Sequence, residues 1–215
     1  MPDTASPPEA ENPHIVTSEA ALTALYPNPI ADASRAKEVS ALTKPYRAWI
    51  EAAPFAVLAT TGPDGLDASP RGDEPGFIRV IDDRTLALPD RRGNNRLDSL
   101  RNILHDPHLA LLFMIPGSAE TLRVNGKGVV TTDPEFLASF AVNGKPPATV
   151  LLINIDTVYF QCGRALLRSA LWDPTKHPDK STIPSPGEML KATTEGFDGD
   201  SYDQALPARQ RDTLY

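Results

Sequence analysis

Short apolar runs, broken at intervals by Gly, Pro, Asp and Asn, fill the middle of the chain. Runs rich in Val, Ile, Leu and Thr that end in such turn residues predict β-strands. The predicted strands cover residues 55–61, 66–71, 76–82, 85–90, 108–116, 120–132 and 148–160. The stretch GPDG has turn chemistry and joins the first two strands, and residues 82–84 join the third and fourth.

A helical period appears elsewhere in the chain. Thr17 or Ser18 can cap a first short helix, which Pro27 ends. Residues 43–53 predict a second helix, because their apolar side chains recur at i, i+3, i+4 and i+7. Residues 94–104 predict a third, with an apolar stripe made of Leu97, Leu100, Ile103 and Leu104. Shorter helices are predicted at residues 133–141, 162–172 and 186–193.

This order has many strands, short helical insertions and no regular βαβ alternation. It predicts a mainly β fold with helices (α+β): an antiparallel barrel with helical decoration at both ends. The Pro-, Ala- and Glu-rich residues 1–14 are expected to be a disordered lead-in, and residues 15–53 a helical segment that covers the barrel. The barrel itself is assigned to residues 54–174. Residues 175–215 are expected to form an extended tail with one short helix.

Composition narrows the possible partners. The 215 residues carry 21 basic and 28 acidic side chains, a net charge of −7, which argues against a nucleic-acid binder. The single cysteine, Cys162, excludes an internal disulfide and is expected to be a small buried residue. No apolar run approaches the roughly 20 residues that a membrane span needs, and the N-terminus lacks signal-peptide features. A cytoplasmic protein without a membrane partner is therefore expected.

The stretch LALPDRRGNNRLDSLRNI concentrates arginines and amides where a strand gives way to a helix. A helix N-terminus presents free N–H groups and a partial positive charge, so it favours an anion. Asn94 and Asn95 can cap this helix, and Gly93 allows a close backbone approach. Guanidinium donors are available from Arg91, Arg92 and Arg96. Arginine is unfavourable at a helix start unless an anion is present, so a phosphate site and a solvated basic turn both remain open.

Two arginines on predicted strands also allow two interpretations each. Arg71 ends the second strand and either binds an anion or lies on the surface, paired with Asp73 or Glu74. Arg123 lies on the opposite strand face from its apolar neighbours, so it points either to solvent or into a cleft. The Asn-Gly pair that follows it, residues 125–126, is a good hairpin signal.

The remaining polar and charged residues do not identify a further site. Arg164 and Arg168 share one face of the predicted helix over 162–172, with Ser169 nearby. The four histidines have no metal-ligand spacing, so no metal site is predicted. No nucleophile-elbow, P-loop or dinucleotide motif occurs, and no side chain is singled out as a general acid or base.

The order of these pieces resembles the pyridoxamine 5′-phosphate oxidase-like flavoproteins, whose fold is an FMN-binding split β-barrel. The resemblance covers about residues 54–174 and is strongest to a bacterial subgroup described as predicted flavin-nucleotide-binding proteins. The matching stretches are FAVLATTGPDGLDASPRGD, LALPDRRGNNRLDSLRNIL, DPHLALLFMIPGSAETLRVNG and VYFQCGRALLRSALW.

The resemblance implies a homodimer with FMN bound at the subunit interface. Arg71 would contact the FMN phosphate, and the phosphate-holding positions at the helix start are Asn94, Asn95 and Arg96. The strand end along the flavin ring is Pro89, Asp90 and Arg91. Thr121 and Arg123 would face FMN from the partner subunit. Arg168 and Ser169 resemble a Gln-Ser pair near the flavin.

Two departures from the family pattern limit what the resemblance implies. The family's Arg-Lys pair is Asn95-Arg96 here, so one cation is lost. The Arg-rich motif that receives the vitamin's phosphate has no counterpart in LPARQRDTLY, residues 206–215. We therefore expect an FMN-dependent oxidoreductase acting on an unidentified small molecule, and not a true pyridoxamine phosphate oxidase. The alternatives are a non-catalytic carrier or sensor of flavin or haem, and a relative that uses the deazaflavin F420.

Overall fold

The computed structural model describes residue 12 and residues 14–215, and divides the chain into two compact units at residues 36 and 37. The first unit holds two helices, α1 (Glu19–Leu25) and α2 (Asp32–Ala36). The Ser18 side chain accepts a hydrogen bond from the N–H of Ala21 (3.2 Å), which confirms the predicted cap and helix. Apart from Asn12 and His14, the predicted disordered lead-in lies outside the described residues.

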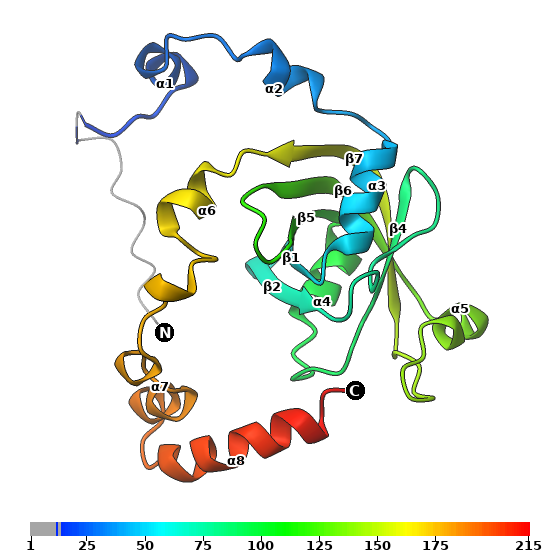
Figure 1. The fold of residues 1–215 in the computed structure, drawn as a ribbon, viewed down its shortest axis with the longest axis vertical. Helices are drawn as coiled ribbons and strands as arrows, with labels where there is room; N and C mark the ends of the chain where they lie inside the picture. Colours follow the sequence, from blue (N-terminus) through cyan, green and yellow to red (C-terminus); the bar gives the residue numbers. More distant parts are fainter. Residues whose placement is uncertain (1–11, 13) are drawn as a thin grey trace. The chain divides into compact units, whose positions relative to one another are not determined.

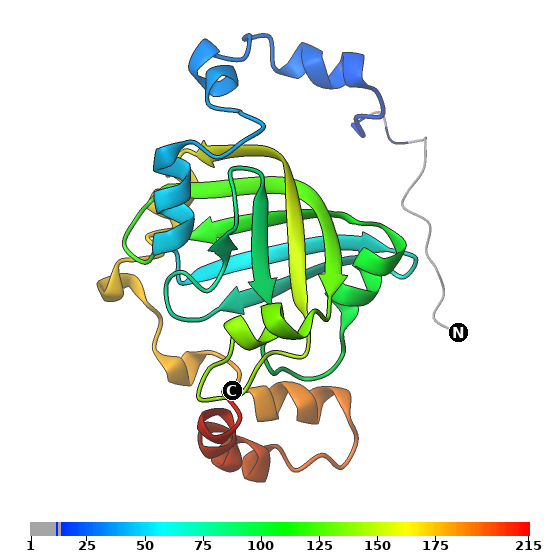
Figure 2. The ribbon, with the colours of Figure 1, turned by 90° about the vertical axis from the view of Figure 1, so that its right-hand side faces the viewer.

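The second unit is built on one seven-stranded sheet. Its strands are β1 (Phe55–Gly62), β2 (Gly65–Gly72), β3 (Arg79–Val80), β4 (Thr85–Pro89), β5 (His108–Met114), β6 (Thr121–Thr131) and β7 (Val150–Gln161). They run in the order β2-β1-β5-β6-β7-β4-β3, and every neighbouring pair is antiparallel. The sheet curls strongly but does not close, because β2 and β3 remain edge strands (Figures 1 and 2). The predicted antiparallel α+β fold is confirmed.

The long pair of β6 and β7 corrects the prediction of a hairpin at Asn125 and Gly126. These residues lie inside β6, at a bulge where the register with β7 shifts. A Cβ atom at Gly126 would collide with the carbonyl oxygen of Asn154. Glycine is therefore needed here for a close approach of two backbones inside a sheet and not for a tight turn.

The concave side of the sheet holds the core, and helix α3 (Lys44–Ala52) contributes to it. The Thr43 side chain caps α3, and Pro45 lies in its first turn. Ile50 is completely buried, and Trp49 packs against the same cluster. Each apolar side chain buried in this way contributes about 1.5–3 kcal/mol, so α3 is fixed by packing on the sheet.

Helix α4 (Asp98–His105) begins four residues later than the predicted start at Asn94. Its buried residues are Ser99, Asn102 and Ile103, whereas Leu104, a member of the predicted apolar stripe, is 75% exposed. The amide of Asn102 donates to the hydroxyl of Thr60 on β1 (3.1 Å). The inner face of α4 is thus polar in part and is held by hydrogen bonds, which an apolar period does not reveal.

The other helices are α5 (Pro134–Ser139), α6 (Arg164–Ser169), α7 (Pro186–Thr193) and α8 (Gly199–Asp212), with 3-10 turns at Pro174–Lys176 and Lys180–Thr182. Helix α7 was predicted, but the 14-residue α8 was not, so the expectation of an extended tail with one short helix is wrong. In the described part of the chain, none of the helices combines the length and apolar character needed to cross a membrane.

Helices α7 and α8 pack together through glycines. A Cβ atom at Gly187 would collide with the backbone of Gly199, and Asp203 accepts hydrogen bonds from the N–H of Gly187 (2.8 Å) and from the Ser185 hydroxyl. This contact holds α8 against α7, although the sequence of α8 has no clear apolar face. Cys162, expected to be buried, is exposed after the end of β7.

Candidate functional site

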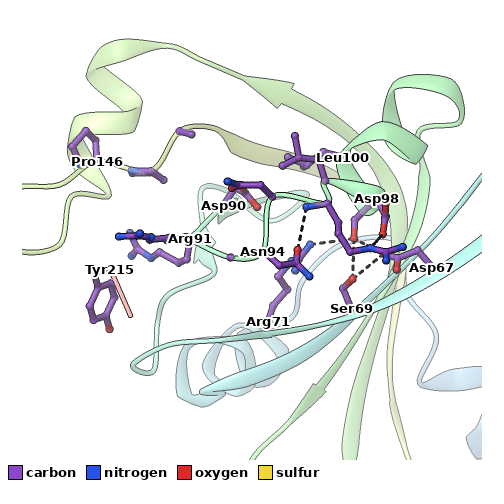
Figure 3. Close-up of a pocket in the computed structure, with 18 of the residues that line it drawn as sticks. Asp67, Ser69, Arg71, Asp90, Arg91, Asn94, Asp98, Leu100, Pro146 and Tyr215 are labelled. Atoms are coloured by element: carbon purple, nitrogen blue, oxygen red, sulfur yellow. Dashed lines mark hydrogen bonds and ion pairs between the residues drawn. The ribbon is translucent and has the colours of Figure 1, made fainter. Parts of the chain in front are cut away.

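A pocket of about 700 Å³ opens beside the edge strand β2. Its walls come from β2, the β4–α4 loop, the first turn of α4 and the loop before β7, with Tyr215 at one end (Figure 3). Six predicted site residues line it: Arg71, Asp90, Arg91, Asn94, Asn95 and Arg96. Pro89 is buried at the end of β4, next to Asp90. The fold therefore brings together residues from β2, β4 and the loop that follows β4.

A hydrogen-bond network joins β2 to α4 at the inner end of the pocket. Arg71 donates from Nη2 to the hydroxyl of Ser99 (3.1 Å), and Ser99 donates to Asp67 Oδ2 (2.5 Å). Ser69 donates to the same carboxylate oxygen (2.9 Å). Ser99 is only 3% exposed, so this network holds the Arg71 guanidinium in a fixed position against the first turn of α4.

The sequence analysis missed Asp67, Ser69 and Ser99. A signal for two of them was present, because residues 67, 69 and 71 alternate along β2 and so project from one face with Arg71. Ser99 gave no such signal. It lies 28 residues from Arg71 in sequence and meets it only through the packing of α4 on β2.

The loop before α4 has an unusual backbone. Asn95 and Leu97 have φ values of 60° and 61°, in the left-handed region that residues other than glycine rarely adopt. The predicted capping by Asn94 and Asn95 is wrong: Leu97 is the N-cap and makes no side-chain cap, while Asn94 Oδ1 accepts from the N–H of Arg96 (3.1 Å). Strained backbone of this kind concentrates at binding sites.

The charges around the pocket are mixed but positive on balance. Five cationic side chains line it, against three carboxylates. The cations are Arg71, Arg91, Arg92, Arg96 and Lys145, and the carboxylates are Asp67, Asp90 and Asp98. Arg96 pairs with Asp98 (2.7 Å) at an exposed position. Burial raises the pKa of Asp90, although the charge of Arg71 opposes this.

At the other end of the pocket, Asp73 binds two of the lining residues, Arg91 and Tyr215. Its carboxylate accepts from Arg91 Nε (2.8 Å) and from the hydroxyl of Tyr215 (2.6 Å). Burial acts to raise the pKa of Asp73, but the hydrogen bonds from Tyr215, the Glu74 N–H and Arg91 outweigh it, so the pKa lies below its usual value. Of the two interpretations of Arg71, pairing with Asp73 or Glu74 does not occur, because Arg91 is the ionic partner of Asp73.

Five predicted residues do not line this pocket: Pro89, described above, and four others. Thr121 and Arg123 lie on β6, where they hydrogen-bond to Gln161 (3.4 Å) and the Tyr159 hydroxyl (3.2 Å). Arg168 and Ser169 lie on the exposed helix α6. Across residue 12 and residues 14–215, no three His, Cys, Asp or Glu side chains are grouped to hold a metal ion.

The protein thus belongs to the antiparallel α+β class, with an open, curled sheet and a basic pocket between an edge strand and a short helix. The family model described as pyridoxamine 5′-phosphate oxidase matches residues 42–162, which is more than half of the chain. The chain belongs to this family. No curated protein sequence matches it.

Several solved structures are similar to part of this chain. HupZ of Group A Streptococcus is 20% identical, with 54% of this chain and 91% of that chain covered at a TM-score of 0.45. A putative pyridoxamine 5′-phosphate oxidase of Lactobacillus delbrueckii is 21% identical, covering 56% and 95% at 0.45. An FMN-binding protein of Syntrophomonas wolfei is 14% identical, covering 53% and 82% at 0.42.

Proposed function

We propose that the protein binds FMN in the pocket beside β2 and acts as an FMN-dependent oxidoreductase on a small molecule. The observation that carries this proposal is the fixed Arg71 guanidinium, held by the buried Ser99 at the first turn of α4. An arginine that is oriented before a ligand arrives loses little conformational freedom on binding it.

The residues present fit a phosphomonoester at this end of the pocket. A phosphate group carries a charge of about −1.5 to −2, and guanidinium forks match its oxygens. Arg71 and Arg96 supply such forks, and the uncapped N–H groups at the start of α4 supply further donors. Asp67 is already engaged with Ser69 and Ser99, so its charge is partly satisfied within the protein.

Bound FMN would supply the redox chemistry, and the protein would bind and orient it. In this proposal Pro89, Asp90 and Arg91 form the strand end along the ring. Arg71, Asn94, Asn95 and Arg96 hold the phosphate.

We also infer that a second copy of the chain completes the site. Four of the expected site residues lie outside the pocket of their own chain: Thr121, Arg123, Arg168 and Ser169. A homodimer with FMN at the interface would bring them to the partner's pocket. Arg123 is half-buried and donates to the Tyr159 hydroxyl, so its guanidinium is held in one orientation.

The substrate is proposed to differ from pyridoxamine phosphate. The arginines of the C-terminal segment do not line the pocket: Arg209 lies on α8, over the ring of Tyr202 at 4.4 Å. The segment reaches the pocket through Tyr215, which cannot supply the cation that a second phosphate needs.

The cofactor is tested by purifying the protein and identifying what it releases on denaturation. A yellow preparation that releases FMN, or an apoprotein that FMN reconstitutes, is the expected result. Release of haem or F420 with no affinity for FMN would overturn the proposal. Reduction of the bound flavin by NADH or NADPH, followed by transfer to an acceptor, would distinguish an enzyme from a carrier.

A further inference from the structure

Tyr215 connects the tail of the chain to the pocket. Its hydroxyl donates to Asp73, 142 residues earlier in the sequence, at 2.6 Å. Its main-chain oxygen accepts from Lys145 Nζ at 3.3 Å. The two contacts come from the loops that follow β2 and α5, so the position of the ring is set by the sheet unit and not by α8 alone.

The two ends of the pocket differ in chemistry. Asp67, Ser69 and Arg71 gather at one side, and Tyr215 lies at the opposite side (Figure 3). Near Tyr215 the wall includes Pro146 and other apolar residues of the loop before β7. The charged end suits a phosphate, whereas an aromatic ring with prolines suits a flat apolar surface.

Unused cationic donors remain in the pocket that Tyr215 lines. Arg91 uses Nε for Asp73 and Nη1 for the carbonyl of Phe140 (2.8 Å). Among the described residues, neither its Nη2 nor the guanidinium of Arg92 has a hydrogen-bond partner. The Arg91 guanidinium carbon lies 5.9 Å from the centre of the Tyr215 ring, so a flat face and unused N–H donors are adjacent.

A second hollow of about 230 Å³ lies next to this pocket. Arg91 and Tyr215 line both spaces, and the second is bordered by Phe77, Arg79 and Phe140. The Tyr215 side chain therefore lies at the boundary of both spaces.

We propose that Tyr215 is a specificity-determining residue, against whose ring the second reactant of the flavin lies, and that this reactant is a planar aromatic anion such as an aromatic carboxylate. The ring would stack on Tyr215, and the carboxylate would be received by Arg92 and Arg91 Nη2. This inference rests on the proposed function, because it needs FMN in the charged part of the pocket.

The test uses benzoate and its neutral isostere benzamide as probes. Each is titrated by calorimetry into the full-length protein, first loaded with FMN and then free of it. The wild type is expected to prefer benzoate. Tyr215→Ala is expected to weaken benzoate binding about three- to tenfold, because the contact between the two rings is lost, and to leave the affinity for FMN unchanged. Arg92→Gln is expected to remove the preference for benzoate over benzamide.

Leu214→Ala is the matched control, because Leu214 precedes Tyr215 and is exposed. Tyr215→Phe keeps the ring but loses the bond to Asp73, and is expected to fall between the wild type and Tyr215→Ala. Unchanged or tighter benzoate binding by Tyr215→Ala would overturn the inference, as would a wild type that binds no benzoate. If FMN itself fails to bind, the proposed function is wrong. The titrations of the FMN-free protein then still show whether benzoate binding depends on Tyr215.

Discussion

The hydroxyl of Ser99 lies 3.1 Å from Nη2 of Arg71 and joins the first turn of α4 to the edge strand β2. Neither residue belongs to a recognised motif by itself. Their contact converts a strand-end arginine into a fixed cation that faces a pocket.

Ser99→Ala is expected to weaken FMN binding without loss of the fold. The arginine keeps its charge but loses the hydroxyl that orients it, a hydrogen bond to a charged group worth about 1.5–3 kcal/mol. Part of this is recovered by solvent, so we expect roughly tenfold weaker binding. Quenching of flavin fluorescence during titration measures it, and an unchanged affinity would mean that Arg71 needs no support.

Arg71→Ala is expected to discriminate between two flavins. FMN should lose about 1.5–3 kcal/mol of binding free energy, whereas riboflavin, which has no phosphate, should lose much less. The control is Arg101→Ala, because Arg101 is exposed on α4 and does not line the pocket. Equal losses for both flavins would show a structural role for Arg71.

Mixing two variants tests whether the site is shared between subunits. Arg71→Ala and Arg123→Ala homodimers should each bind FMN poorly, since one residue of every site is missing. After subunit exchange, about one quarter of the sites should be intact, because half of the dimers are mixed and each of these has one unaltered site. No recovery, or a monomer that binds FMN tightly, would contradict the interface site.

The Asp73–Tyr215 contact predicts how stability depends on pH. The pKa of Asp73 is lowered from 3.8, so its contribution is present above that value and is lost as the pH falls through the folded-state pKa. The pKa of Tyr215 is raised from 10.0, chiefly by the hydrogen bond to Asp73, so its contribution is lost only as the pH rises through the higher folded-state pKa. The contact should therefore persist between these limits.

Urea unfolding from about pH 5 down to about pH 1 measures the acid limit. Asp73→Asn should lose less stability over this range than the wild type does. The matched control is Asp64→Asn, in the exposed turn between β1 and β2, which should follow the wild type.

Gly126→Ala tests the bulge in β6. The added methyl group collides with backbone of β7, which cannot move as a side chain can, so a loss of about 1–3 kcal/mol in unfolding free energy is expected. Gly93→Ala is the control, since the nearest atom to a Cβ there is 4.0 Å away. Equal stability of the two variants in thermal melts would show that the sheet adapts at Gly126.

The sequence was informative where structure depends on local pattern. Most strands follow apolar runs bounded by turn residues, although the strand predicted at 76–82 is only Arg79–Val80, and the cap at Ser18 is a local hydrogen bond. The basic loop could be located for the same reason, because Arg91, Asn94 and Arg96 are close in sequence. Periodicity and capping rules apply to such neighbours.

The rest depended on contacts between distant residues. Ser99 meets Arg71 only after α4 packs on β2, and Tyr215 reaches Asp73 only after the tail has folded back. The Asn-Gly pair at 125–126 was predicted to form a turn but lies inside β6. Glycine is needed there because the backbone of β7 passes close to it. Tertiary packing decided each of these.

Arg71 stands on β2, and β2 has a strand neighbour on one side only. A ligand that bridges Arg71 and the start of α4 would thus stabilise one of the two edges of the sheet. Ligand binding would raise the free energy of unfolding, and this increase would grow with the logarithm of the ligand concentration. Melting temperature is therefore a simple screen for what this protein holds, even before any reaction is known.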